Sequence, residues 1–316
     1  MKVVFFGTAD FGIPTLDAIR ASSIHSLVGV VTGPDKPRGR GRALSATPIA
    51  TALEESAFQP ILKPERLGDP EFVARLRLFG ADAFVVVAFR ILPESVYTIP
   101  QFAFNLHASL LPAYRGAAPI QRAIMAGETR TGVTTFLLQK TVDTGDILGQ
   151  RESTIGAEET AGELYERLST LGAELVINTL DKLESGQVET APQDPSVACP
   201  APKITESDLW LDFGKSARQL TNQVRALAPR PGGSVGFRDS TAKILALAPV
   251  DSPSLHGPMG AIVALDSQKG PIVATGQGLV CITRIQPAGK STQSGAEFIR
   301  GYHPEPGEFF GAPTKA

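Results

Sequence analysis

The fold is decided by residues 2–31, which read KVVFFGTADFGIPTLDAIRASSIHSLVGVV. The apolar run from Val3 to Phe6 predicts a buried strand, residues 11–20 predict a helix, and residues 27–31 predict a second strand. A strand, a helix and a second strand in this order favour parallel pairing of the two strands. The start of the chain therefore predicts a parallel sheet covered by helices.

The turn after the first strand, at residues 7–12, is a candidate for ligand binding. It reads GTADFG and stands between a strand and a helix, where free backbone N–H groups can bind an anion or a polar ligand. Its spacing differs from the G-x-G-x-x-G pattern of dinucleotide sites, and Thr32-Gly33-Pro34 follows the second strand in place of an acidic residue. The alternative is that its glycines only permit a tight turn.

Strands and helices continue to alternate toward the middle of the chain. The further predicted elements are helices at 47–55 and 69–79, strands at 83–89, 102–107 and 133–138, and a short helix that begins at Pro119. Repeated alternation indicates an α/β protein with a doubly wound, mostly parallel sheet.

A long helix closes this first domain. Thr160 and Glu163 have the spacing of a capping box, and leucines at helical spacing continue as far as Gly186. We therefore expect the first domain to span residues 1–185.

The remainder of the chain has a different pattern. Residues 186–203 are rich in proline, which favours an extended linker over a packed core. Residues 204–316 contain one amphipathic helix, at about 216–228, and short apolar runs separated by Gly and Pro. That pattern predicts a second, smaller domain built as a β-barrel.

The composition limits the classes of partner. The 316 residues include 30 Lys and Arg against 32 Asp and Glu, for a formal net charge of −2, so any polyanion must be bound by a local group of charges. Hydrophobic residues make up 42% of the chain and charged residues 20%, which argues against disorder. The opening apolar run is far shorter than that of a signal peptide, so we expect a cytoplasmic protein.

The cysteines and histidines do not have the spacing of a metal site. Cys199 and Cys281 are the only cysteines and have no paired spacing, which argues against a disulfide framework or a cysteine zinc site, and His25, His256 and His303 are scattered. We expect no metal.

The most basic stretch of the chain is residues 33–47, where four cationic residues alternate with glycine and proline. The four are Lys36, Arg38, Arg40 and Arg42. Arginines interleaved with glycines favour a mobile loop whose guanidinium groups can bind phosphates, including those of RNA. A solvated surface loop without a partner is the alternative.

Asn105 and His107 form a candidate catalytic pair. They are two residues apart on a predicted strand, so their side chains point to the same face at its carboxyl end, where open α/β sheets bind ligands. A carboxamide and an imidazole can stabilise a developing oxyanion, and the imidazole can also transfer a proton. The alternative is a histidine whose role is only structural.

Asp143 follows another predicted strand and is a candidate partner for this pair. A carboxylate beside an imidazole can orient it and stabilise its protonated form. The alternative is an Asx turn that closes a hairpin. Ser109 lacks a nucleophile-elbow sequence, so it is not a convincing nucleophile.

Six segments together resemble the methionyl-tRNA formyltransferase family, within the wider group of formyltransferases that use 10-formyltetrahydrofolate. These segments are Phe6–Phe11, Pro34–Gly41, Asn105–Pro112, Arg115–Gln121, Asp143–Asp146 and Gln286–Lys290. The resemblance covers essentially the whole chain. It implies a Rossmann-like formyltransferase domain, an extended linker and a C-terminal domain of OB-fold type that binds tRNA.

The resemblance also implies a reaction and its residues. The reaction is transfer of a formyl group from 10-formyltetrahydrofolate to the α-amino group of methionyl initiator tRNA. The catalytic residues would be Asn105, His107 and Asp143, and the basic loop would contact the tRNA acceptor stem. The folate-binding residues would be Ser109, Leu110, Leu111, Pro112, Phe89 and Ile91. We expect a monomer.

The segment Val86–Pro93 departs from the family pattern. It reads VVAFRILP, one residue shorter than the usual Val-Val-Ala-Tyr-Gly-x-Ile-Leu-Pro and without the glycine, in a loop that borders the pterin pocket of the family.

Two other functions remain open from the sequence. A sugar-nucleotide N-formyltransferase would share the catalytic trio, but it would be expected to have a nucleotide-diphosphate pocket in place of a long basic loop. A non-catalytic RNA-binding protein built on the same two domain types would bind RNA without folate-dependent turnover.

Overall fold

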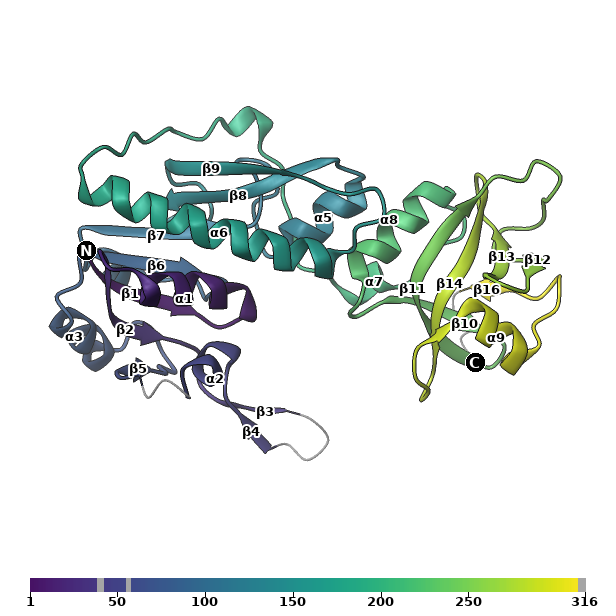
Figure 1. The fold of residues 1–316 in the computed structure, drawn as a ribbon, viewed down its shortest axis with the longest axis horizontal. Helices are drawn as coiled ribbons and strands as arrows, with labels where there is room; N and C mark the ends of the chain where they lie inside the picture. The colour runs from purple at the N-terminus through teal and green to yellow at the C-terminus, as the bar shows by residue number, and fades with distance from the viewer. Residues whose placement is uncertain (39–42, 55–57, 312–316) are drawn as a thin grey trace. The chain divides into compact units, whose positions relative to one another are not determined.

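The computed structural model describes residues 1–38, 43–54 and 58–311 (Figure 1). The chain divides into two compact units. Unit 1 comprises Met1–Pro119, Arg130–Thr154 and Tyr165–Ala201, and unit 2 comprises Ile120–Thr129, Ile155–Leu164 and Pro202–Ala316. Within the described residues, we find no helix with the length and apolar character needed to span a bilayer.

The centre of unit 1 is a seven-stranded sheet in the order β5-β2-β1-β6-β7-β8-β9. Its strands are β1 (Lys2–Gly7), β2 (Ser26–Val31), β5 (Ile61–Leu62), β6 (Ala83–Val87), β7 (Phe102–His107), β8 (Arg130–Leu137) and β9 (Ile147–Thr154). The first five strands in this order pair in parallel, whereas β8 pairs antiparallel with both β7 and β9. The prediction of a Rossmann-like, doubly wound and mostly parallel sheet is confirmed.

Helices cover this sheet. They are η1 (Asp10–Gly12), α1 (Ile13–Ala21), α2 (Pro48–Glu54), α3 (Pro70–Leu78), α4 (Glu94–Tyr97) and α6 (Ala161–Glu184). Helix α6 runs along the sheet (Figure 1), with Gly172 against Leu106 of β7 and Thr179 hydrogen-bonded to Thr135 of β8. Its predicted capping box is present, since the Thr160 backbone N–H donates to Glu163 Oε2 at 2.8 Å.

The basic stretch includes two short antiparallel strands, β3 (Lys36–Arg38) and β4 (Ala43–Ser45). Lys36 is exposed on β3. Arg40 and Arg42 lie outside the described residues.

Unit 2 contains a curled antiparallel sheet in the order β12-β13-β14-β11-β10-β16. Its strands are β10 (Gly233–Phe237), β11 (Ser240–Val250), β12 (Ile262–Asp266), β13 (Gly270–Ala274), β14 (Leu279–Pro287), β15 (Gln293–Ser294) and β16 (Phe310–Gly311). A bridge between Ala261 and Phe309 links the two ends of the sheet, and Phe237, Phe298 and Phe310 pack in its core. The predicted OB-type β-barrel is confirmed.

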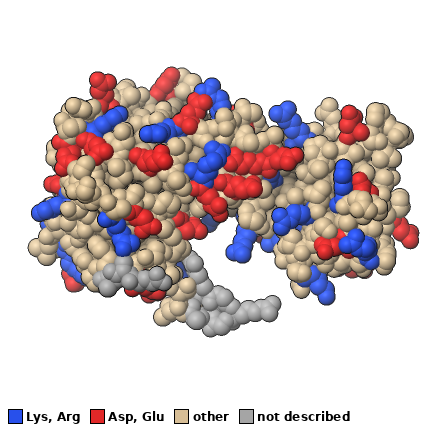
Figure 2. Space-filling view, in the orientation of Figure 1, with Lys and Arg blue, Asp and Glu red and all other residues tan. Residues whose placement is uncertain are grey.

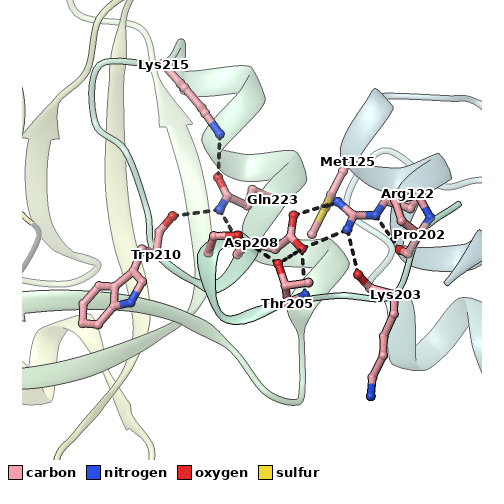
Figure 3. Close-up of polar contacts among 10 residues, drawn as sticks. Arg122, Met125, Pro202, Lys203, Thr205, Asp208, Trp210, Lys215 and Gln223 are labelled. Atoms are coloured by element: carbon pink, nitrogen blue, oxygen red, sulfur yellow. Dashed lines mark hydrogen bonds and ion pairs between the residues drawn. The ribbon is translucent and has the colours of Figure 1, made fainter. Parts of the chain in front are cut away.

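Four helices accompany the barrel, namely α5 (Pro119–Ala126), α7 (Glu206–Leu209), α8 (Ala217–Leu227) and α9 (Gly295–Tyr302). A polar cluster joins α5, α7 and α8 within unit 2 (Figure 3). Arg122 of α5 donates to both carboxylate oxygens of Asp208, at 2.7 and 2.9 Å, and the Gln223 amide of α8 donates to the backbone carbonyls of Asp208 and Trp210. These hydrogen bonds therefore fix α7, near the start of residues 204–316, to α5 and α8.

Acidic and basic side chains are interspersed over the face shown in Figure 2, in line with the net charge of −2. Binding of a polyanion on such a surface depends on local groups of charges.

Candidate active site

The site begins at the carboxyl end of β7, in the interior of the sheet of unit 1. Asn105 and His107 are two residues apart on this strand, which pairs with β6 on one side and β8 on the other. Their side chains therefore project from the same face. Asn105 is partly exposed, and among the described residues its side chain makes no hydrogen bond to the protein.

The orientation of His107 is determined by a backbone carbonyl. Its Nε2 lies 2.9 Å from the Tyr114 carbonyl oxygen, and its side chain is only 7% exposed. A carbonyl can only accept, so Nε2 carries a proton and Nδ1 is the nitrogen left to react. The ring of Phe136 lies edge-on at 6.4 Å between centroids.

Asp143 is the group that faces this nitrogen. Its Oδ2 lies 4.0 Å from His107 Nδ1, and its side chain is 13% exposed. That separation is too long for a direct hydrogen bond but allows ionic attraction or a bridging water. The same oxygen accepts a hydrogen bond from the Gly116 backbone N–H at 2.9 Å, which holds the carboxylate in place. The carboxylate can therefore stabilise a proton on Nδ1.

The turn after β7 is held by Thr134 of β8. The Thr134 hydroxyl donates to the Ser109 carbonyl at 2.7 Å and accepts from the Leu111 backbone N–H at 3.1 Å. The Ser109 hydroxyl donates to the Ala113 carbonyl at 2.6 Å, a bond that serves the turn. Leu110 is partly buried and Leu111 is buried, so residues 109–112 form a firm, largely apolar wall beside His107.

Phe89 and Ile91 follow the neighbouring strand, β6. That strand ends at Val87, two residues earlier than predicted, because Ala88 adopts a left-handed conformation with φ of 47°. Phe89 packs against Phe6 at 5.7 Å between ring centroids, whereas Ile91 is 72% exposed. The segment therefore presents apolar surface at the carboxyl edge of the sheet.

The first strand-to-helix turn uses its backbone N–H groups in hydrogen bonds within the protein. The Phe11 N–H donates to the Tyr165 hydroxyl at 2.8 Å, and the Gly12 N–H donates to the Ala9 carbonyl. Tyr165 also hydrogen-bonds Asp10, and burial together with this carboxylate raises the pKa of Tyr165 well above its usual range. These contacts favour the tight-turn interpretation over an anion site.

The sequence did not single out residues 191–201 for the site, although they run beside it within unit 1. Ala191 exchanges backbone hydrogen bonds with Ile147, and Arg115 exchanges them with Cys199 and Ala201. Gln193 contacts the Asp143 loop through its side chain. The sequence offers only one glutamine among prolines here. A single polar residue shows no periodicity, so the stretch predicts an extended segment and no contact with the site.

Across the described portion of the chain, no three His, Cys, Asp or Glu side chains are arranged to hold a metal ion. Cys281 is buried in β14, and burial raises the pKa of its thiol to about 11, which disfavours the reactive thiolate.

Comparison with protein families gives two matches along the chain. The formyl transferase model matches residues 1–180, and the model of the formyl transferase C-terminal domain matches residues 203–303.

Among similar sequences, a methionyl-tRNA formyltransferase of Sulfurihydrogenibium sp. is 40% identical over 314 residues, covering 98% of this chain and 100% of that protein. A methionyl-tRNA formyltransferase of Synechococcus sp. is 43% identical over 313 residues, covering 95% of each chain.

Similar folds occur among solved structures. HypX from Aquifex aeolicus, in complex with tetrahydrofolic acid, has a TM-score of 0.65 at 19% identity, and the match covers 95% of this chain but 48% of HypX. The sugar 3N-formyl transferase WlaRD has a TM-score of 0.66 at 17% identity, with 92% and 99% of the two chains covered. At these identities the likeness concerns the fold alone.

Proposed function

Since this chain belongs to the methionyl-tRNA formyltransferases of the formyl transferase family, we propose that Asn105, His107 and Asp143 carry out its chemistry. The enzyme transfers a formyl group from a folate donor to the α-amino group of methionyl initiator tRNA. The observation that supports this assignment is the arrangement at His107, where Tyr114 orients the ring and Asp143 faces Nδ1.

The proposed donor is 10-formyltetrahydrofolate, and the proposed step is a direct displacement. The neutral α-amine attacks the formyl carbon and forms the new C–N bond. The bond from that carbon to N10 of the folate then breaks, the amine loses one proton, and the departing nitrogen gains one. Because the folate carries the activated one-carbon unit, the protein contributes positioning and electrostatics.

Asn105 and His107 have separate roles in this step. The Asn105 carboxamide donates to the formyl oxygen as negative charge develops there, an interaction typically worth about 2.7–4 kcal/mol of barrier. His107 can donate to the same oxygen only through Nδ1, since Nε2 is occupied by Tyr114. Asp143 stabilises the imidazole ring when both of its nitrogens carry protons. Directly or through water, Asp143 also helps to take the proton that the attacking amine loses.

The folate site is proposed at the carboxyl ends of β6 and β7. Its residues are Phe89, Ile91, Ser109, Leu110, Leu111 and Pro112. Support comes from the adjacency of these two strands and from the apolar surface that follows each of them. No metal is invoked in the proposed step.

The tRNA is proposed to bind through two parts of the chain. The basic stretch supplies Lys36, Arg38, Arg40 and Arg42 to the acceptor stem, and residues 204–316 form a separate tRNA-binding domain after the linker at 186–203. We place the enzyme in the cytoplasm as a monomer.

The test is formyl transfer from labelled 10-formyltetrahydrofolate to methionyl-tRNA and, in parallel, to amino-sugar nucleotides. Transfer to methionyl-tRNA alone is expected. Transfer only to the sugar nucleotides would overturn the proposal and indicate a sugar-nucleotide N-formyltransferase. RNA binding without transfer to either acceptor would indicate a non-catalytic RNA-binding protein.

A further inference from the structure

Gln193 lies in the proline-rich segment that the sequence presents as a linker, two residues before the short helix η2 (Pro195–Val197). We propose that Gln193 is a positioning residue for formyl transfer, which joins the Asp143 loop to the loop that orients His107. This inference rests on the proposed roles of Asp143 and His107.

All four hydrogen-bonding positions of the Gln193 carboxamide are used. Its Nε2 donates to the carbonyl oxygens of Asp143 at 3.1 Å and Gly145 at 2.8 Å. Its Oε1 accepts from Arg115 Nε at 3.0 Å and Arg115 Nη2 at 2.6 Å. Carbonyls only accept and a guanidinium only donates, so these partners permit one orientation of the amide. A carboxamide is the group that satisfies both sides.

The Asp143 loop makes a tight turn close to the sheet. Asp143 has φ of 55°, in the left-handed region that Asp adopts more readily than most L-residues. Two residues later, a Cβ at Gly145 would lie 1.7 Å from the Leu137 carbonyl oxygen, so the loop passes very close to the end of β8. The two hydrogen bonds from Gln193 bracket this turn and hold the carboxylate at its place opposite His107.

The second loop holds the other half of the catalytic pair. Tyr114 gives its carbonyl to His107 Nε2, and the Gly116 backbone N–H donates to Asp143 Oδ2. Arg115 stands between these two residues, and its guanidinium is bound by Gln193. One side chain therefore links the backbone that orients the imidazole to the backbone that carries the carboxylate.

The segment around Gln193 is anchored without its side chain. Ala191 and Ile147 exchange backbone bonds of 2.8 and 3.0 Å, and the Arg115 N–H donates to the Cys199 carbonyl at 2.9 Å. The Ala201 N–H donates to the Arg115 carbonyl at 2.6 Å. These bonds lie on both sides of Gln193, so a substitution there should leave the segment in place and change the register of the two loops.

The first variant for testing this in the full-length enzyme is Gln193→Glu. It keeps the size of the side chain and the acceptor for Arg115, but it puts a carboxylate oxygen against the carbonyls of Asp143 and Gly145. We expect kcat to fall about 10- to 100-fold, with the KM for methionyl-tRNA and the Kd for 10-formyltetrahydrofolate within about threefold of the parent. Gln187→Glu makes the same change at an exposed glutamine of the preceding segment and should leave all three constants unaltered.

The decisive measurement is a double-mutant cycle with Asp143→Asn, followed in single turnovers. A residue that acts through Asp143 adds little once that carboxylate is gone, so the double variant should be within about threefold of Asp143→Asn alone. Multiplication of the two losses would overturn the proposal, as would an unchanged kcat in Gln193→Glu or a parallel loss of folate binding.

Two further results separate this inference from the proposed function. If Asp143→Asn retains full activity, the role of Asp143 fails first, whatever Gln193 does. If Asp143→Asn is impaired and Gln193→Glu is not, only the positioning role fails. Should Gln193→Glu melt well below the parent, Arg115→Lys tests the same link, because it keeps the charge and loses the paired donation, and independence from Asp143→Asn would again overturn the proposal.

Discussion

Replacing Asp143 with Asn is the most direct test of the proposed chemistry. The two side chains are nearly the same size, and both Asp and Asn tolerate the left-handed backbone found at position 143. The Asn oxygen can still accept from the Gly116 N–H, so the loop should retain its shape. The change therefore removes the negative charge that faces His107 and little else.

The size of the effect follows from the separation of 4.0 Å between Asp143 Oδ2 and His107 Nδ1. Opposite unit charges at this distance attract by about 4 kcal/mol at an effective dielectric constant of 20 and by about 1 kcal/mol in water. Both side chains are largely shielded, so the first figure is the better guide. A loss of about 2–4 kcal/mol in stabilisation of the protonated imidazole corresponds to a rate lower by about 30- to 1000-fold.

The assay is single-turnover formylation of methionyl-tRNA with saturating 10-formyltetrahydrofolate, together with the Kd for folate and thermal unfolding. The rate constant should fall while folate affinity and Tm stay close to those of the parent. A rate within about threefold of the parent would refute the role given to Asp143.

Three further predictions concern the basic stretch, unit 2 and the Asp143 loop. In the basic stretch, we expect replacement of Arg38, Arg40 and Arg42 with Ala to raise the KM for methionyl-tRNA. The slope of log binding constant against log salt concentration should become shallower by about 0.7–0.9 for each phosphate that the protein no longer neutralises. An unchanged slope would exclude this stretch from tRNA binding. Arg122 holds the pKa of Asp208 well below its usual range, so Asp208→Asn should destabilise unit 2 by about 2 kcal/mol near neutral pH. The difference in free energy of unfolding between the parent and Asp208→Asn should be constant above about pH 3.9, the pKa of an Asp in the unfolded chain, and should become smaller as the pH falls below it. A difference that does not vary with pH would contradict the ion pair. Gly145→Ala should displace the Asp143 loop, because its Cβ would meet the Leu137 carbonyl, and formylation should fall at least as far as in Asp143→Asn; parent-like activity would show that the loop can move freely.

The fold could be predicted from the sequence because its signals are local. Four consecutive apolar residues at Val3–Phe6 form a fully buried strand, and the Thr160 and Glu163 pair caps the helix that it predicts. The end of β6 was wrong by two residues because the run Ala83–Phe89 stays apolar through a left-handed turn at Ala88. The hydrophobicity of a segment predicts that it is buried, but it does not predict the left-handed φ of Ala88 that ends this strand.

The candidate site could be predicted only where its residues share one strand. The spacing of two places Asn105 and His107 on one face without further information. The partner of His107 Nε2 is a backbone carbonyl, and the group that brackets the Asp143 loop is a glutamine fifty residues further along the chain. Carbonyls have no sequence signature, and a single polar side chain in an extended segment has no periodicity, so neither contact could be read before the structure was known.

The loop after β6 is held in place by one arginine, Arg90. Ala88 makes a left-handed turn that a glycine would make more easily, and Arg90 follows two residues later. The Arg90 guanidinium donates to the carbonyls of Pro64 at 2.7 Å and Glu65 at 3.0 Å, and it lies 5.4 Å above the Phe89 ring. Phe89 is thereby held between Arg90 and the core, and Ile91 is left exposed. Arg90 therefore ties the loop to the segment after β5, and apolar side chains stand at the carboxyl end of β6, where the folate site is proposed.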